Sequence, residues 1–182
     1  MEALTRARVV RVVLTGSEST GKSTLAVELA RHYGAELVPE FVRAFAEQKG
    51  AAIDFGDHGP IARGQMALED AAVVRAPRLI VQDTDLLSTV VYCRHYFGRC
   101  PPWIEEAAAA RRPHLYLLCG IDVEWVADGV RDRGHMRDEM QRLFVDAVRA
   151  SGARCLDVSG SPARRFDDAT RAIDAVIAAT LG

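Results

Sequence analysis

The residues best suited to chemistry stand together in a glycine-rich stretch near the start of the chain. Residues 16–23 read Gly-Ser-Glu-Ser-Thr-Gly-Lys-Ser and match the GxxxxGK[ST] pattern at every fixed position. A loop of this kind turns its backbone N–H groups toward phosphate oxygens, and the helix after it adds the positive end of its dipole. Lys22 is expected to reach the β- and γ-phosphates of ATP, and the Ser23 hydroxyl is expected to bind Mg²⁺. The expected ATP-binding residues of this stretch are Gly16, Ser17, Glu18, Ser19, Thr20, Gly21, Lys22, Ser23 and Thr24.

Two aspartates follow a second apolar run. Residues 79–83 are typical of a buried strand that ends in Asp83, and Asp85 comes two residues later. Ligands of open α/β sheets bind at the carboxyl ends of the strands, so we expect Asp83 to organise Mg²⁺ together with Ser23. Asp85 projects toward the same side in an extended chain and is a candidate to orient or deprotonate a phosphoryl acceptor. Its alternative role is the N-cap of the next helix.

Glu40 is a second candidate for that role. It follows the short predicted strand 36–38 and Pro39, and Arg43 stands three residues further on. A carboxylate at this point can accept the proton of an attacking hydroxyl, and the arginine can bind phosphate or substrate. The alternative is a surface ion pair between residues i and i+3 of one helix. The choice between Glu40 and Asp85 as the base stays open.

A compact domain with this loop near its N-terminus suits a small-molecule kinase, and the Asn-Lys-x-Asp stretch of guanine readers is absent. Arginines also gather after the predicted strand 115–119, in a segment of about residues 122–137. We expect this segment to be a lid in which Arg131, with Arg133 or Arg137, closes over the γ-phosphate and excludes water. The alternative is an arginine-rich surface loop.

Predicted strands alternate with predicted helices along the whole chain, which indicates βαβ units and a parallel sheet covered on both faces. We therefore predict a three-layer α/β P-loop fold with a five-stranded sheet in a single domain, residues 1–182. The expected strands are 9–14, 36–38, 79–83, 115–119 and 153–158, and the expected helices are 23–33, 40–48, 60–74, 85–97, 101–110, 138–150 and 163–181.

Composition excludes several classes of protein. The 23 Lys and Arg nearly balance the 25 Asp and Glu, giving a formal net charge of −2, so broad electrostatic binding to nucleic acid is not expected. The first apolar run, residues 9–14, is too short for a membrane span or the core of a signal peptide. The four cysteines form no CxxC pair. We expect a cytoplasmic protein without nucleic-acid or membrane partners.

Several stretches resemble ribosylnicotinamide kinase domains, the C-terminal kinase domains of the bacterial NAD-biosynthesis regulator. The resemblance runs in order over nearly the whole chain. Its matches in Asp-Thr-Asp, Gly-Gln and Trp-Val-Ala-Asp-Gly-x-Arg, which begin at Asp83, Gly64 and Trp125, are much more discriminating together than singly. It also includes residues 16–25, 39–43 and 61–65. It implies ATP-dependent phosphorylation of the 5′-hydroxyl of nicotinamide riboside, giving nicotinamide mononucleotide. The chain before Val9 has no room for the family's DNA-binding or adenylyltransferase parts, so neither activity is expected.

A cationic nicotinamide ring favours carboxylates and aromatic faces. The expected substrate-binding residues are Glu40, Arg43, Gln65, Asp85, Trp103 and Trp125, with Tyr92 as a further aromatic candidate. For the aromatic residues the alternative is packing in the core, and for Gln65 it is a polar helix face. Two other functions stay open. One is a P-loop kinase for another nucleoside or small metabolite, and the other is a regulatory module that senses nucleotides and hydrolyses ATP slowly.

Overall fold

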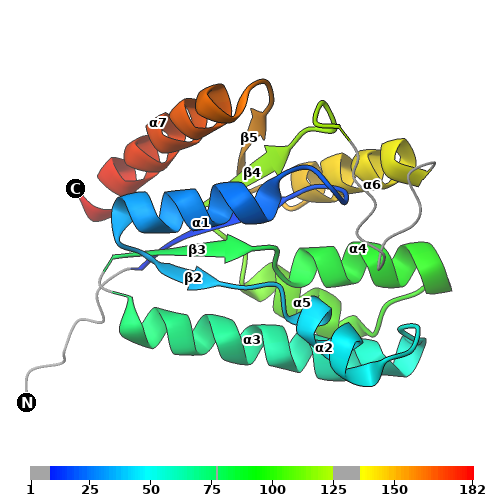
Figure 1. Cartoon of the computed structure of the whole chain (residues 1–182). Helices are drawn as coiled ribbons and strands as arrows, with labels where there is room; N and C mark the ends of the chain where they lie inside the picture. The colour runs from blue at the N-terminus through cyan, green and yellow to red at the C-terminus, as the bar shows by residue number, and fades with distance from the viewer. Residues whose placement is uncertain (1–8, 77, 125–135) are drawn as a thin grey trace, which may run out of the picture.

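A five-stranded parallel sheet forms the centre of the computed structural model, which describes residues 9–76, 78–124 and 136–182 (Figure 1). The strands lie in the order β2-β3-β1-β4-β5. They are β1 (Val10–Thr15), β2 (Glu36–Val38), β3 (Leu79–Asp83), β4 (Leu115–Cys119) and β5 (Arg154–Val158). The predicted five-stranded parallel sheet is confirmed, because every strand pair is parallel.

Helices cover both faces of the sheet. The helices are α1 (Lys22–Tyr33), α2 (Phe41–Lys49), α3 (His58–Arg75), α4 (Leu86–Phe97), α5 (Pro102–Ala110), α6 (Arg137–Ala150) and α7 (Pro162–Leu181). Helices α1 and α7 pack on one face, and α3 to α6 lie on the other (Figure 1). Helix α3 begins two residues before its predicted start, because a short 3-10 helix (Phe55–Asp57) with an Asp54 capping box leads directly into it.

The alternation of side chains along the strands makes the two faces chemically different. Val10, Val12 and Leu14 of β1 point into the apolar core beneath α1 and α7. The opposite face contains buried polar groups, including Gln82 of β3 and Tyr116 of β4. The Tyr116 hydroxyl reaches Asp85, just past the carboxyl end of β3, so these polar groups border the edge where the candidate site is found.

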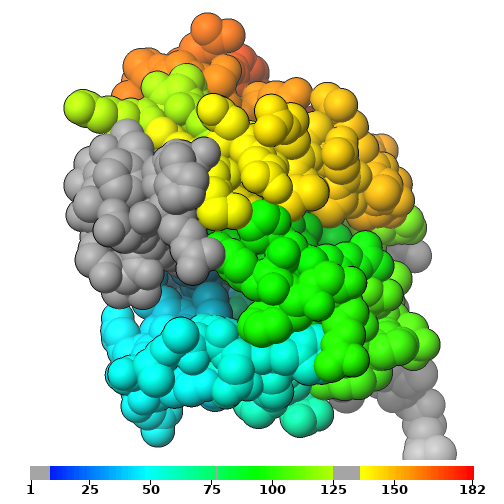
Figure 2. Space-filling model, turned by 90° about the vertical axis from the view of Figure 1, so that its right-hand side faces the viewer, coloured from blue at the N-terminus to red at the C-terminus, as the bar shows by residue number. Residues whose placement is uncertain are grey.

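The carboxyl ends of β1, β3 and β4 meet at one edge of the sheet. Strand β1 pairs with β3 and β4, and the register places Leu14 opposite both Asp83 and Leu117. Figure 2 looks onto this side of the molecule, where α2, α4 and α6 are arranged around the edge in cyan, green and yellow. In the part of the chain that the structure describes, no helix is long and apolar enough to cross a membrane.

Candidate nucleotide-binding and phosphoryl-transfer site

The P-loop, residues 16–23, joins β1 to α1 and needs both of its glycines. Gly16 has φ 129° and Gly21 has φ 77°, conformations that side chains with a Cβ rarely adopt. A Cβ on Gly16 would also lie 2.6 Å from the Cys119 carbonyl oxygen, so the loop packs directly against the end of β4. The predicted strand–loop–helix context of this motif is therefore present.

Lys22 lies across the loop that precedes it. Its side chain is buried, and Nζ donates a hydrogen bond of 2.8 Å to the Ser17 carbonyl. The Thr20 hydroxyl donates to the same carbonyl at 3.0 Å. A buried ammonium group beside a close backbone curl fits a phosphate group, because both the charge and the N–H groups favour an anion.

Ser23 and Asp83 meet at the mouth of the P-loop. The Ser23 hydroxyl donates a hydrogen bond of 2.5 Å to Asp83 Oδ2. The main chain beside Asp83 is tied to β1, because Thr84 N donates to Leu14 O at 3.0 Å. Among the described residues no cluster of three or more His, Cys, Asp or Glu could hold a metal ion. One hydroxyl and one carboxylate fit Mg²⁺, which takes few protein ligands and completes its shell with water and phosphate oxygens.

Asp85 is buried, and both of its carboxylate oxygens accept hydrogen bonds. Oδ1 accepts from Leu87 N at 3.1 Å, which makes Asp85 the N-cap of α4. Oδ2 accepts from the Tyr116 hydroxyl at 2.6 Å. Burial is the main cause that raises the pKa of Asp85 to about 6, against the opposing effect of these hydrogen bonds. The helix-cap alternative is confirmed, and a role as base would compete with these two contacts.

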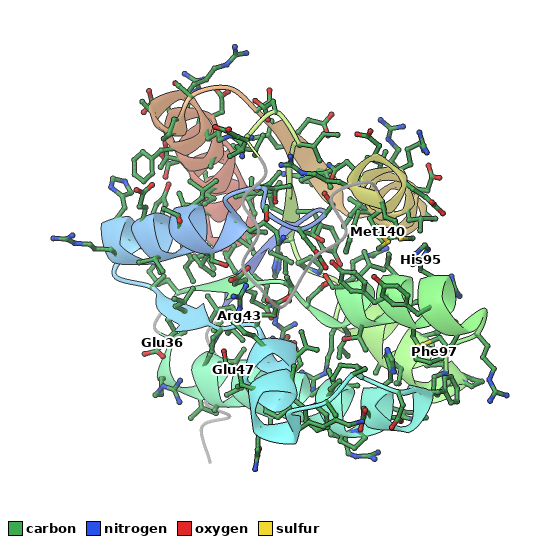
Figure 3. The ribbon with its side chains drawn as sticks, turned by 45° about the vertical axis from the view of Figure 1, so that its right-hand side comes forward. Glu36, Arg43, Glu47, His95, Phe97 and Met140 are labelled. Atoms are coloured by element: carbon green, nitrogen blue, oxygen red, sulfur yellow. The ribbon has the colours of Figure 1, made fainter. Side chains whose placement is uncertain are left out.

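Glu40 immediately precedes α2 and is not used to cap it. Its side chain is 8% exposed, and Oε2 lies 3.7 Å from Arg43 Nε, so the predicted i,i+3 pair forms. The register pairs Val38 with Gln82, so Glu40 and Thr84 each lie two residues beyond this pair and stand level with each other. Figure 3 shows Arg43 on the side of α2 that is turned toward the centre of the molecule.

Gly64 and Gln65 of α3 hold the junction between β2 and α2. Gln65 is buried; its Oε1 accepts from Phe41 N at 2.9 Å, and its Nε2 lies 3.4 Å from Pro39 O. A Cβ on Gly64 would lie 2.2 Å from the Phe41 ring, so only glycine lets the ring pack there. Gln65 therefore binds the backbone on both sides of Glu40, a structural role that the sequence did not predict. Its predicted contact with substrate stays a prediction.

The aromatic candidates pack against their neighbours. Trp103 joins a cluster with Leu86 and Ile104, and the Arg63 guanidinium lies 5.1 Å from its ring centroid. Tyr92 contacts Phe144 of α6 edge-on, with ring centroids 5.5 Å apart. In Figure 3, the labels His95 on α4 and Met140 on α6 mark the place where these two helices face each other, and Phe97 marks the last residue of α4. The packing alternative is thus observed for both aromatic residues.

The predicted lid lies mostly outside the described residues, which leaves Trp125, Arg131 and Arg133 without a structural account. Arg137, at the start of α6, is described. Its Nη2 donates to the carbonyls of Ser19 and Val123, both at 2.8 Å. The guanidinium therefore contacts the backbone of the P-loop, and its expected contact with the γ-phosphate stays a prediction.

Sequence reasoning missed two side chains that hold the P-loop from outside. Gln141 accepts from Ser17 N at 2.9 Å and donates to Cys119 O at 3.1 Å, so it ties the loop to β4. Arg165 donates to Thr20 O at 2.7 Å. The sequence does contain a sign of the buried position of Arg165, because Arg165 lies four residues before Ala169 on the buried stripe of α7.

The comparisons with known proteins agree with this geometry. The family described as AAA domain matches residues 11–165. The trifunctional NAD biosynthesis/regulator protein NadR of Escherichia coli (strain K12) is 34% identical over an alignment of 143 residues, which covers 75% of this chain and 35% of that protein. The protein of the same name from Salmonella typhimurium (strain LT2) is 31% identical over 153 residues, covering 81% of this chain and 37% of its own. The chain thus spans little more than a third of these curated relatives.

Solved structures share the fold. A NadR protein in complex with NR aligns with a TM-score of 0.81 at 25% identity, over 95% of this chain and 53% of that one. A NadR protein in complex with NAD and AMP-PNP gives 0.78 at 22% identity, over 93% and 50% of the two chains. Thymidylate kinase from Ehrlichia chaffeensis gives 0.65 at 13% identity, over 92% and 98%. The predicted three-layer α/β fold of P-loop kinases is confirmed.

Proposed function

The chain belongs to the AAA domain family and is homologous to NadR, and from this premise we propose that it phosphorylates nicotinamide riboside with ATP. The product would be nicotinamide mononucleotide. The observation that carries the proposal is the P-loop with the Ser23–Asp83 pair at its mouth, in a chain that aligns over 95% of its length with a NadR protein in complex with NR. The proposal concerns this kinase reaction alone, because the relatives are much longer than the chain.

The proposed transfer uses the P-loop to hold the donor. The loop N–H groups and the Lys22 ammonium bind the phosphates of ATP. The acceptor 5′-oxygen forms a bond to the γ-phosphorus, the bond from that phosphorus to the β–γ bridging oxygen breaks, and ADP leaves. Ser23 and Asp83 would hold Mg²⁺, which, when bound, neutralises phosphate charge. Arg131 is proposed to close over the γ-phosphate with Arg133 or Arg137.

Glu40 is the better candidate to take the proton of the acceptor hydroxyl. Both oxygens of Asp85 already serve the fold, because they accept hydrogen bonds from Leu87 N and Tyr116, whereas the mostly buried carboxylate of Glu40 pairs with Arg43 at the junction between β2 and α2. The junction that carries Glu40 is also held firmly by Gln65. A base must lie within reach of the proton that it accepts, and the sheet register places Glu40 level with Thr84, beside the carboxyl end of β3. We therefore propose Glu40 as the base and Asp85 as the residue that shapes the start of α4.

The decisive experiment is an assay of ADP release by the purified chain with Mg·ATP and a panel of nucleosides. We expect nicotinamide riboside to stimulate release strongly and nicotinamide mononucleotide to appear in equal amount, measured by chromatography. If only a different nucleoside stimulated ADP release, that nucleoside would be the acceptor and the proposal of nicotinamide riboside would be wrong. Slow hydrolysis that no acceptor stimulates would contradict a kinase and favour a nucleotide-sensing module.

A further inference from the structure

Arg165 connects three loops at the nucleotide end of the sheet. It lies in the first turn of α7, and its side chain is 6% exposed. Its guanidinium donates to Thr20 O of the P-loop at 2.7 Å, to Gly120 O after β4 at 3.2 Å, and to Gly160 O after β5 at 3.0 Å. A guanidinium is buried at low cost only when its N–H groups are satisfied in this way.

The charge of Arg165 has a partner. Asp122 Oδ1 accepts from Arg165 Nη2, and Asp122 Oδ2 accepts from Gly160 N at 2.5 Å. The carboxylate therefore fixes both the guanidinium and the turn before α7. This arrangement holds Arg165 in one orientation, with Nη1 directed at the P-loop.

The contact with Thr20 determines the direction of a peptide group. A trans peptide is planar, so its C=O and its N–H point to opposite sides. Because the Thr20 carbonyl points out of the P-loop toward Arg165, the Gly21 N–H of the same peptide points the other way. Arg137 has the same relationship to the preceding peptide, since it binds Ser19 O at 2.8 Å. Two successive carbonyls are therefore held outside the loop by guanidinium groups.

We propose that Arg165 is a positioning residue for triphosphate binding, which acts by holding the Thr20 carbonyl outside so that the Gly21 N–H is directed at a bound phosphate. The inference rests on the nucleotide-binding part of the proposed function. A guanidinium on the carbonyl also polarises the peptide and makes its N–H a stronger donor. Arg165 is close enough to polarise this peptide, because its Nη1 lies 2.7 Å from the Thr20 carbonyl oxygen and 4.0 Å from the place where a Cβ on Gly21 would lie.

The test measures the affinity of the full chain for ADP, inorganic pyrophosphate and adenosine by calorimetry. Arg165→Met should bind ADP and pyrophosphate about 10- to 100-fold more weakly, the loss expected for a hydrogen bond to a charged group. Binding of adenosine, which has no phosphate, should change much less. The matched control is Arg164→Met, because the neighbouring Arg164 is 69% exposed and pairs with Asp168. We expect the control to bind all three ligands like the unmodified chain.

Two milder variants keep the test decisive if Arg165→Met does not fold. Arg165→Lys retains the charge but cannot bridge three carbonyls, so we expect an intermediate loss of ADP affinity. Asp122→Asn frees the guanidinium from its carboxylate and should weaken ADP and pyrophosphate alike. Folded variants that bind ADP and pyrophosphate normally would overturn the proposal, and so would an equal loss for adenosine.

The outcome is independent of the acceptor. A chain that binds ADP and pyrophosphate but leaves nicotinamide riboside unphosphorylated would contradict the proposed kinase, while the comparison of Arg165 variants would still decide this inference. A chain that binds neither ADP nor pyrophosphate would contradict both.

Discussion

The Ser23 hydroxyl donates a hydrogen bond of 2.5 Å to Asp83, although sixty residues separate the two along the chain. The contact follows from the parallel pairing of β1 with β3, which places Asp83 beside Leu14 at the strand ends. Helix α1 begins at Lys22, within the P-loop, so its first turn brings Ser23 to the same place. Two hard oxygen groups thus meet where the phosphates of ATP are proposed to bind.

Replacing Asp83 with asparagine should change the requirement for magnesium. Asparagine keeps an oxygen for the Ser23 hydroxyl but removes the negative charge that attracts the cation. We expect Asp83→Asn to raise the Mg²⁺ concentration needed for half-maximal activity by about tenfold or more. Magnesium titrations of ADP release measure this, with Asp157→Asn on the exposed part of β5 as the control. An unchanged titration curve would show that Asp83 does not hold the metal.

Lys22 offers a comparison with a matched control, because Lys49 is the only other lysine of the chain. Lys22→Ala should lower kcat by about 100-fold or more, because it removes the charge that is proposed to bind the transferred phosphoryl group. Lys49 pairs with Asp54 and Asp57, so Lys49→Ala should retain near-normal turnover. Steady-state assays of both variants decide the point, and equal activities would refute the assignment of Lys22.

Glu40→Gln should separate catalysis from binding. Glutamine has nearly the same shape but cannot take up the hydroxyl proton, so we expect kcat to fall by about 100-fold while ADP affinity stays unchanged. Asp85→Asn is the comparison, because the asparagine oxygen can still accept the N-cap hydrogen bond from Leu87 N, and its NH2 group can donate to the Tyr116 hydroxyl oxygen. If Asp85→Asn lost far more kcat than Glu40→Gln, the two roles would be exchanged.

Gly64 should tolerate a methyl group only when Phe41 is made smaller. A Cβ at Gly64 would lie 2.2 Å from the Phe41 ring, so Gly64→Ala should lower the free energy of unfolding by about 1–3 kcal/mol. In a Phe41→Leu background the same change should cost clearly less. Urea unfolding of the two single variants and the double variant gives the coupling energy. Strictly additive effects would mean that the ring does not require the glycine.

The sequence predicts the elements well and their long-range contacts poorly. Apolar runs such as residues 79–83 identify buried strands, and GxxxxGK[ST] identifies the P-loop, because both are local patterns. The contact of Gln65 with Phe41 N and that of Arg165 with Thr20 O depend on which strands are neighbours, and periodicity carries no such information. Asp85 shows the same limit, because only the fold brings Tyr116 to its second oxygen.

Asp122 should make stability depend on pH on the acid side. The Gly160 N–H is the main group that holds the pKa of Asp122 below its usual range, and Arg165 adds to the effect. A depressed carboxyl pKa contributes stability that is fully present above the unfolded value of about 3.9 and is lost as the pH falls through the folded value. Urea unfolding between pH 2 and pH 7 should therefore show a smaller acid loss in Asp122→Asn than in the unmodified chain. Asp146→Asn, on α6 and away from this cluster, is the control. Parallel curves for the unmodified chain and Asp122→Asn would mean that the carboxylate gains nothing from Gly160 and Arg165 on folding.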